Sequence, residues 1–211
     1  MADHGEGPLK RVSTMGYGDR SDEAYDQWAK DYEADLTKYG YLSPQLIADA
    51  LQDYVGASAT VVDYACGTGL AGVELASRGF TTIDGVDYSQ GMLEFAASKT
   101  VQGRPVYREL LTVDLTATIP IEDGAYDALI CVGAMGGGHL APEHLPELMR
   151  TIASGGIAAF YMNAIAYEGD GFAKRFAALE TAGHWQIISE TPSNYMAELD
   201  RPGMLVLAAR P

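Results

Sequence analysis

The sequence predicts one α/β domain with a mostly parallel sheet, and three observations lead to this prediction. Its 211 residues match the size of a single large domain. The composition, 47% hydrophobic and 20% charged, supplies enough apolar side chains for a sizeable core. Along most of the chain, short apolar runs alternate with stretches of helical periodicity, which is typical of parallel strands connected by covering helices.

The first 56 residues are expected to form a tail and then a helical cap. Residues 1–20 are rich in glycine and in charges of both signs, which indicates a flexible tail. We expect one domain over residues 21–211, whose helical cap covers about residues 21–56. The residues behind the cap prediction are Tyr25, Trp28 and Tyr32, at the spacing of an amphipathic helix, and Ser43, Pro44 and Gly56, which delimit a second helix.

Five strands of the parallel sheet and four helices are expected after the cap. The strands are predicted over residues 59–62, 81–86, 106–109, 126–132 and 157–162. The helices are predicted over residues 70–77, 90–98, 143–152 and 172–182. The last two strands, residues 185–189 and 204–209, have no obvious helix between them, so we expect an antiparallel hairpin at the end of the sheet.

Charge and cysteine content disfavour several kinds of protein. The formal net charge of −15 argues against nucleic acid as a partner, because non-specific affinity for phosphates comes from Lys and Arg. No apolar run reaches the roughly 18 residues of a membrane span, and the N-terminus has no signal pattern. The expected location is therefore the cytoplasm, without a membrane partner. Cys66 and Cys131 are expected as buried thiols, and no metal site is predicted.

The most informative stretch is an apolar strand that ends in an acid and a glycine-rich turn. It reads Val-Val-Asp-Tyr-Ala-Cys-Gly-Thr-Gly-Leu over residues 61–70, with the acid at Asp63 and glycines at Gly67 and Gly69. A turn with few side chains lets a ligand approach the backbone, and the amides of the following helix then lie beside that ligand. The pattern predicts a ligand site at this turn.

Two kinds of ligand fit the glycine turn. Gly67 to Gly72 also match the dinucleotide fingerprint G-x-G-x-x-G, with Asp87 at the expected distance, so an NAD(P)-dependent oxidoreductase is an alternative. Asp63 argues against it, because an acid before the turn would repel a pyrophosphate. The same acid would attract the ammonium of an amino-acid cofactor, directly or through water. S-adenosylmethionine has that ammonium and no phosphate.

The segment around the turn resembles motif I of class I methyltransferases, which depend on S-adenosylmethionine, and the resemblance extends along most of the chain. It implies a Rossmann-like fold with a seven-stranded, mostly parallel sheet, a C-terminal antiparallel strand, and helices on both faces. It also implies transfer of the cofactor's methyl group to an acceptor by in-line displacement. Ala65 departs from the family, which has a glycine at that position.

The resemblance also implies roles for individual residues. The acid after the second strand, Asp87, would accept hydrogen bonds from both ribose hydroxyls, and Met92 would pack against the adenine. Asp114 would receive the adenine amino group, and Tyr32 would lie near the methionine carboxylate. The full expected cofactor-binding set is Tyr32, Asp63, Ala65, Gly67, Gly69, Asp87, Tyr88, Met92, Asp114, Leu115 and Cys131.

A narrower resemblance rests on residues 25–32 together with residues 65–69. These segments are similar to the methyltransferase-like proteins of the Williams-Beuren syndrome region group, which implies no known substrate. We expect a small-molecule acceptor near the fourth strand end, with His139 as the candidate general base. A protein that binds S-adenosylmethionine without catalysis is a further alternative. The expected acceptor-binding residues are Tyr25, Trp28, Gly133, Met135, Tyr161 and Asn163.

Overall fold

The computed structural model describes residues 31–137 and 139–211. The predicted tail and the first part of the predicted cap, including Tyr25 and Trp28, lie outside these residues. The remaining cap is helical over residues 31–38 and again in α3 (Ser43–Gln52). No helix in the described part of the chain is long and apolar enough to cross a membrane.

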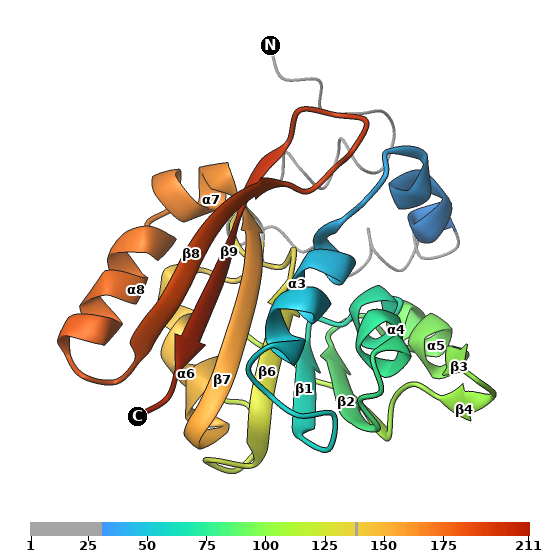
Figure 1. Cartoon of the computed structure of the whole chain (residues 1–211), viewed down its shortest axis with the longest axis horizontal. Coiled ribbons are helices and arrows are strands. Elements are labelled where there is room, and N and C mark those ends of the chain that lie inside the picture. Colours follow the sequence, from blue (N-terminus) through green and yellow to red (C-terminus); the bar gives the residue numbers. More distant parts are fainter. Residues whose placement is uncertain (1–30, 138) are drawn as a thin grey trace.

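The predicted seven-stranded sheet is confirmed, and its order is β5-β2-β1-β6-β7-β9-β8 (Figure 1). Neighbouring strands from β5 to β7 are parallel, whereas β9 runs antiparallel to both β7 and β8. The predicted C-terminal hairpin is therefore confirmed as well. The strands are β1 (Thr60–Tyr64), β2 (Thr82–Asp87), β5 (Glu109–Thr112), β6 (Tyr126–Val132), β7 (Ile152–Asn163), β8 (Gln186–Asn194) and β9 (Pro202–Ala209).

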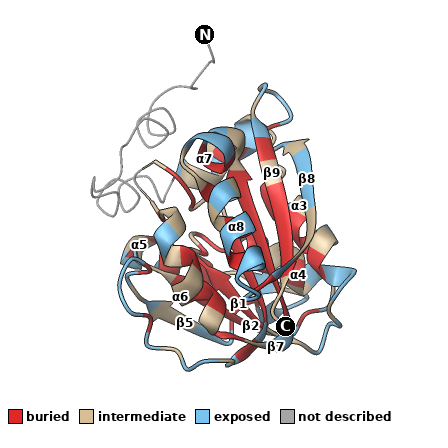
Figure 2. Cartoon of the chain, turned by 90° about the vertical axis from the view of Figure 1, so that its left-hand side faces the viewer, coloured by how far each residue is buried: buried red, intermediate tan, exposed pale blue. Residues whose placement is uncertain are grey.

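Helices cover both faces of the sheet, as expected. Strand side chains alternate between two buried clusters, so Val61 packs with α3, α4 and α5, whereas Val62 packs with α6, α7 and α8. Figure 2 shows β9 largely buried beside the exposed outer surface of α8, whereas the edge strand β8 is exposed or intermediate along its length. The helices are α4 (Leu70–Ser77), α5 (Gln90–Ala97), α6 (Leu145–Arg150), α7 (Ala164–Gly169) and α8 (Phe172–Thr181); a 3-10 turn, η1 (Pro142–His144), precedes α6.

The third predicted strand, residues 106–109, is wrong in its position. Regular pairing with β2 begins at Glu109, and residues 106–108 lead into it after the short hairpin of β3 (Thr100–Val101) and β4 (Arg104–Pro105). The reason is that Tyr107 and Arg108 turn to buried carboxylates on opposite faces of the sheet. The predicted helix over residues 143–152 is also too long, because Ile152 already pairs in β7.

Two features of the fold were not predicted. The helix α7 begins directly after β7, where the Asn163 side chain accepts a hydrogen bond from Ala166 N at 2.8 Å and caps the helix. The loop between β8 and β9 is bound to residues 39–42 through three backbone hydrogen bonds. These bonds run from Leu42 N to Tyr195 O at 2.9 Å, from Ala197 N to Gly40 O at 2.8 Å, and from Glu198 N to Tyr39 O at 3.1 Å.

Candidate active site

The glycine turn connects β1 to α4 at the carboxyl edge of the sheet, where ligands of open α/β folds bind. Three of its residues have left-handed backbone conformations, with φ of 55° at Ala65, 55° at Gly67 and 93° at Gly69. A Cβ atom added to Gly67 would meet no atom within 4 Å, so open space borders the turn. The turn therefore offers its backbone to a ligand.

Asp87 lies at the rim of this open space and holds the turn in place. Its Oδ2 accepts a hydrogen bond from Gly67 N at 2.8 Å, and its Oδ1 accepts one from Ser89 N at 2.9 Å. The neighbouring strand ends are joined in the same region, because Cys66 N donates to Val86 O and Val113 N donates to Asp87 O, both at 3.0 Å. The turn, Asp87 and the end of β5 thus form one continuous edge.

The other predicted cofactor residues on this edge differ in exposure. Tyr88 is 43% exposed, whereas Met92 and Leu115 are buried, so a contact of Met92 with adenine stays a prediction. Asp114 is exposed beyond β5, and its Oδ1 accepts hydrogen bonds from Thr116 N at 2.9 Å and Thr116 Oγ1 at 2.6 Å. Asp87 and Asp114 therefore follow neighbouring strands at the same edge.

Tyr107 is a buried neighbour of the glycine turn that the sequence did not reveal. Its ring fills the space over three glycines: a Cβ at Gly69 or at Gly85 would lie 3.0 Å from a ring carbon, and one at Gly72 would collide with the hydroxyl. Gly72, the third glycine of the dinucleotide fingerprint, is thus explained by a tyrosine of this chain. The spacing of the glycines could have indicated that a large side chain packs against the turn. The sequence does not show that this side chain is Tyr107, because Tyr107 reaches the glycines only through the arrangement of the strands.

Asp63 is fully buried beneath the turn, where its Oδ2 accepts a hydrogen bond from Tyr107 Oη at 2.7 Å. Burial raises the pKa of the Asp63 carboxyl to about 7, against the lowering effect of the Tyr107 hydrogen bond, and the charge of Asp87 raises it further. Burial and Asp63 likewise raise the pKa of Tyr107, so its hydroxyl stays a donor. Contact of Asp63 with a ligand ammonium stays a prediction.

The described part of the cap reaches the glycine turn. Lys99 Nζ, at the end of α5, forms an ion pair with Glu33 Oε1 of the cap at 2.5 Å. The Lys99 side chain also passes Gly69, since its Cγ would lie 3.4 Å from a Cβ there. Tyr32 lies in the same helical segment, partly buried, and acts on the pKa of Tyr41. Its predicted place near a methionine carboxylate stays untested.

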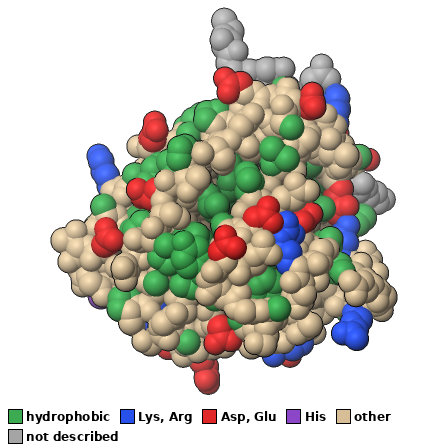
Figure 3. Space-filling model, viewed as in Figure 1, with side chains coloured by type: hydrophobic (Ala, Val, Ile, Leu, Met, Phe, Trp, Pro, Cys, Tyr) green, Lys and Arg blue, Asp and Glu red, His purple; other side chains and the backbone are tan. Residues whose placement is uncertain are grey.

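An open hollow lies between the cap, α3 and the first turns of α4. Its walls include Leu70, which directly follows the glycine turn, but neither Gly67 nor Asp87. Acidic side chains are spread over the visible face of the molecule and do not form one patch (Figure 3). The walls of the hollow are Leu36, Thr37, Tyr41, Pro44, Gln45, Leu70, Val73 and Glu74.

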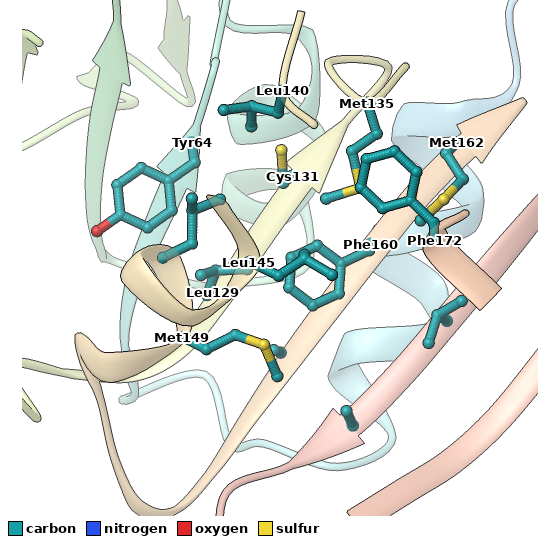
Figure 4. Close-up of a cluster of buried hydrophobic side chains, with 14 of the residues drawn as sticks. Tyr64, Leu129, Cys131, Met135, Leu140, Leu145, Met149, Phe160, Met162 and Phe172 are labelled. Atoms are coloured by element: carbon teal, nitrogen blue, oxygen red, sulfur yellow. The ribbon is translucent and has the colours of Figure 1, made fainter. Parts of the chain in front are cut away.

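The end of β6 forms the neighbouring part of the edge. Gly133 has φ of 72°, its N donates to Tyr161 O at 2.9 Å, and a Cβ there would lie 3.2 Å from Tyr41 Oη. Tyr41, which the sequence did not reveal, therefore closes over the strand end. Cys131 and Met135 are buried in the core cluster of Figure 4, so a contact of either with a ligand stays a prediction.

His139 follows the glycine-rich loop after β6. Its imidazole is partly buried, and burial lowers its pKa, so the ring is neutral at pH 7 and can accept a proton. The loop packs tightly against α7, because a Cβ at Gly136 would lie 2.5 Å from Ala166 Cβ. This chemistry is compatible with a general base.

The polar side-chain atoms of Tyr161 and Asn163 are engaged in hydrogen bonds within the fold. Tyr161 is buried, and its hydroxyl lies 2.6 Å from Ser193 Oγ in the C-terminal hairpin. Asn163 caps α7. A role for either in acceptor binding stays a prediction.

The residues present fit a cofactor at this edge. Besides the open space at Gly67 and the carboxylates of Asp87 and Asp114, the Thr68 hydroxyl in the turn is buried without a hydrogen-bond partner in the described part of the chain. A buried hydroxyl that lacks a partner is costly, and a bound ligand can supply one. The arrangement suits a ligand with hydroxyl and amine donors.

Residues 61–156 match the family model described as "Methyltransferase domain". Over 135 residues the chain is 38% identical to human methyltransferase-like protein 27, an alignment that covers 62% of this chain and 53% of that protein. This relative bears out the narrower resemblance of the sequence. Bovine 18S rRNA (guanine-N(7))-methyltransferase is 35% identical over 75 residues, which cover 36% of this chain and 25% of the bovine protein. The chain thus spans about half or less of these relatives.

Solved structures confirm the fold. The crystal structure of the (4+2)-cyclase SpnF has a TM-score of 0.70 at 14% identity and covers 93% of this chain and 99% of its own. A structure described as a putative S-adenosylmethionine-dependent methyltransferase from Listeria monocytogenes has a TM-score of 0.63 at 18% identity, covering 81% of this chain and 99% of its own. At such identities the likeness shows the architecture alone.

Proposed function

We propose that this chain is a class I S-adenosylmethionine-dependent methyltransferase, which transfers a methyl group from S-adenosylmethionine to a small molecule. The observation that carries the proposal is the hydrogen bond from Gly67 N to Asp87 Oδ2, which places a carboxylate beside an open glycine turn. A carboxylate at this rim suits ribose hydroxyls, which both S-adenosylmethionine and a dinucleotide carry. Asp63 beneath the turn favours the amine of S-adenosylmethionine over the pyrophosphate of the NAD(P) alternative.

Different residues of this edge would bind different parts of the cofactor. Asp87 would accept hydrogen bonds from the ribose, the backbone at Gly67 would border the amino-acid end, and Asp114 would receive the adenine amino group. When bound, S-adenosylmethionine supplies the activated methyl group. The protein then has to align the acceptor and exclude water, for which the cap and Tyr41 are suitably placed.

His139 would act as general base for an acceptor that must lose a proton. Its lowered pKa favours the neutral imidazole that this step requires, and it follows the strand end at Gly133. We expect His139→Ala to lower kcat for a hydroxyl or protonated amine acceptor and to change KM much less. An unchanged kcat would remove His139 from the mechanism.

The small-molecule acceptor is supported by charge. A net charge of −15 disfavours an RNA acceptor, even though the bovine relative is named for one. Turnover to S-adenosylhomocysteine with a panel of amines, phenols, acids and thiols, with rRNA as a separate arm, tests this choice. Methylation of the RNA alone would contradict it. A cytoplasmic location stays a prediction, which the two free, buried thiols fit.

Ligand-induced stabilisation tests the cofactor. S-adenosylmethionine and S-adenosylhomocysteine should raise the melting temperature through binding to the folded state, whereas NAD and NADP should not. Asp87→Ala should raise the dissociation constant on the order of 10- to 150-fold, the effect of roughly 1.5 to 3 kcal/mol for hydrogen bonds to a charged group. Stabilisation by NAD alone would overturn the assignment.

A second candidate is binding of the cofactor without methyl transfer. The likeness to SpnF favours it, because that protein is named as a cyclase and fold alone does not fix chemistry. Binding of S-adenosylhomocysteine together with no turnover over the whole acceptor panel would support this candidate.

A further inference from the structure

Tyr107 connects the glycine turn with the buried carboxyl of Asp63. Its ring determines how closely Gly69 and Gly85 approach, and its hydroxyl reaches Asp63 at 2.7 Å. Tyr107 is 8% exposed and lies against Gly69, Gly72 and Gly85, whereas no atom lies within 4 Å of a Cβ added at Gly67. It therefore does not line the proposed site, and any effect on a ligand passes through the turn or through Asp63.

The described residues around Asp63 supply no cation to compensate its charge. The groups that act on its carboxyl are the Tyr107 hydroxyl, the backbone of Gly72 and the carboxylate of Asp87. Burial raises the pKa of the thiols of Cys66 and Cys131, which also feel Asp63, so both stay neutral around pH 7. The side chain of Lys99 passes Gly69, and its ammonium is paired with Glu33.

We propose that Tyr107 is a positioning residue for cofactor binding, which acts by holding Asp63 so that its ionised carboxylate can attract the ammonium end of the cofactor. This inference rests on the proposed cofactor. An ammonium near the turn favours the ionised form of Asp63. Binding should therefore release the Asp63 proton to the solvent, and affinity should rise with pH until Asp63 is ionised in the free protein.

The Tyr107 hydroxyl sets the pH at which this happens. Its hydrogen bond stabilises the carboxylate, so removal of the hydroxyl should move the ionisation of Asp63 to higher pH. Tyr107→Phe keeps the ring over the three glycines and removes only the donor. A second tyrosine offers a matched control, because Tyr126 Oη donates to the buried Asp84 at 2.9 Å and that carboxylate is also held by Arg108.

The test is calorimetric titration of the full chain with S-adenosylhomocysteine from pH 5.5 to 8.5, in two buffers of different ionisation enthalpy to count released protons. Wild type should bind more tightly as pH rises, with a midpoint near 7, and release a proton below that midpoint. In Tyr107→Phe the midpoint should move up by about one unit, so that affinity at pH 7 falls up to about tenfold. Tyr126→Phe should match wild type.

Asp63→Asn keeps an acceptor for Tyr107 and removes the titration. It should bind with no pH dependence and no proton release in this range, and it carries the test if Tyr107→Phe does not fold. A wild-type affinity that is independent of pH, or a Tyr107→Phe midpoint equal to that of wild type, would overturn the inference alone. Absence of binding in every variant and in wild type would overturn the proposed cofactor as well.

Discussion

Two buried aspartates on adjacent strands of one sheet are stabilised in different ways. Asp63 of β1 is 1% exposed and faces the side of α4 and α5, where the Tyr107 hydroxyl is its side-chain donor. Asp84 of β2 is 2% exposed, accepts a hydrogen bond from Tyr126 at 2.9 Å, and has both its oxygens held by the guanidinium of Arg108. The first carboxyl lies beneath the glycine turn, and the second lies away from it.

The difference shows what a cation does for a buried carboxylate. A buried charge is costly unless it is paired and hydrogen-bonded, and Arg108 meets both needs of Asp84 with two N–H groups. Within residues 31–137 and 139–211, Asp63 has hydrogen bonds without a cation, and burial raises its pKa to about 7. Asp84 is therefore built for structure, whereas Asp63 can change its charge near neutral pH.

The largest expected effect is the loss of a pH dependence in Asp63→Asn. Because the folded state holds the Asp63 proton up to about pH 7 and the unfolded state releases it near pH 4, the wild-type free energy of unfolding should fall as pH rises through this window. Relative to the variant, the fall should be on the order of 1 kcal/mol per pH unit. Urea unfolding at pH 5, 6, 7 and 8 measures it, and parallel curves would refute the uncompensated charge.

Removal of the cation from the second pair should have the next largest effect. Arg108→Met leaves Asp84 buried and unpaired, which should lower the free energy of unfolding by about 3 kcal/mol; the half-exposed arginine keeps this value at the low end for buried pairs. Arg78→Met is the control, since Arg78 pairs with the exposed Asp49 and the partly exposed Glu74, neither of which would be left buried, and it should cost less than about 1 kcal/mol. Equal losses would mean that burial of Asp84 does not matter.

Gly72→Ala tests the packing of Tyr107 against the turn. The added methyl would collide with the Tyr107 hydroxyl, so we expect a loss of about 2 kcal/mol in the free energy of unfolding, typical of overpacking. Gly56→Ala is the control, because a Cβ there meets no atom within 4 Å, and it should be neutral within about 0.5 kcal/mol. If both variants unfold like wild type, Tyr107 does not fix the glycine spacing.

The smallest effect is expected for Tyr126→Phe, which removes one donor from Asp84 while Arg108 remains. Its free energy of unfolding should fall by about 1 kcal/mol. Tyr107→Phe should lose more at pH 8, where Asp63 is ionised and the described residues offer no cation to replace the hydroxyl. Thermal or urea unfolding of the two variants at pH 8 compares them, and a greater loss in Tyr126→Phe would reverse the comparison.

The parts of the fold with strong local signals were predicted from the sequence. The strand over residues 126–132 and the helix over residues 70–77 have the predicted bounds, because an apolar run and a glycine turn define them without distant contacts. The shift of the third strand to β5 depends on Tyr107 and Arg108 reaching carboxylates on other strands. Local periodicity does not contain that information.

The candidate site divides in the same way. Asp87 beside Gly67 follows from the order strand, turn and helix, and the structure brings the two together. Tyr41 comes to the end of β6 through the pairing of the cap with the C-terminal hairpin, which joins segments far apart in sequence. Asn163 was expected to bind the acceptor, but its side chain caps α7. An asparagine directly before an apolar run is a signal for the start of a helix, so the sequence could have indicated this cap.

Residues 39–42 are bound to the loop between β8 and β9, which the ribosome synthesises more than 150 residues later, so these contacts cannot form early in synthesis. The ribosome adds roughly 5 to 20 residues per second, so residues 39–42 stay without these contacts until residues 195–201 have been added. Contacts between segments so far apart in sequence form slowly compared with local structure. The parallel strands β1, β2, β5, β6 and β7 can therefore pair first, and the cap joins the C-terminal hairpin afterwards.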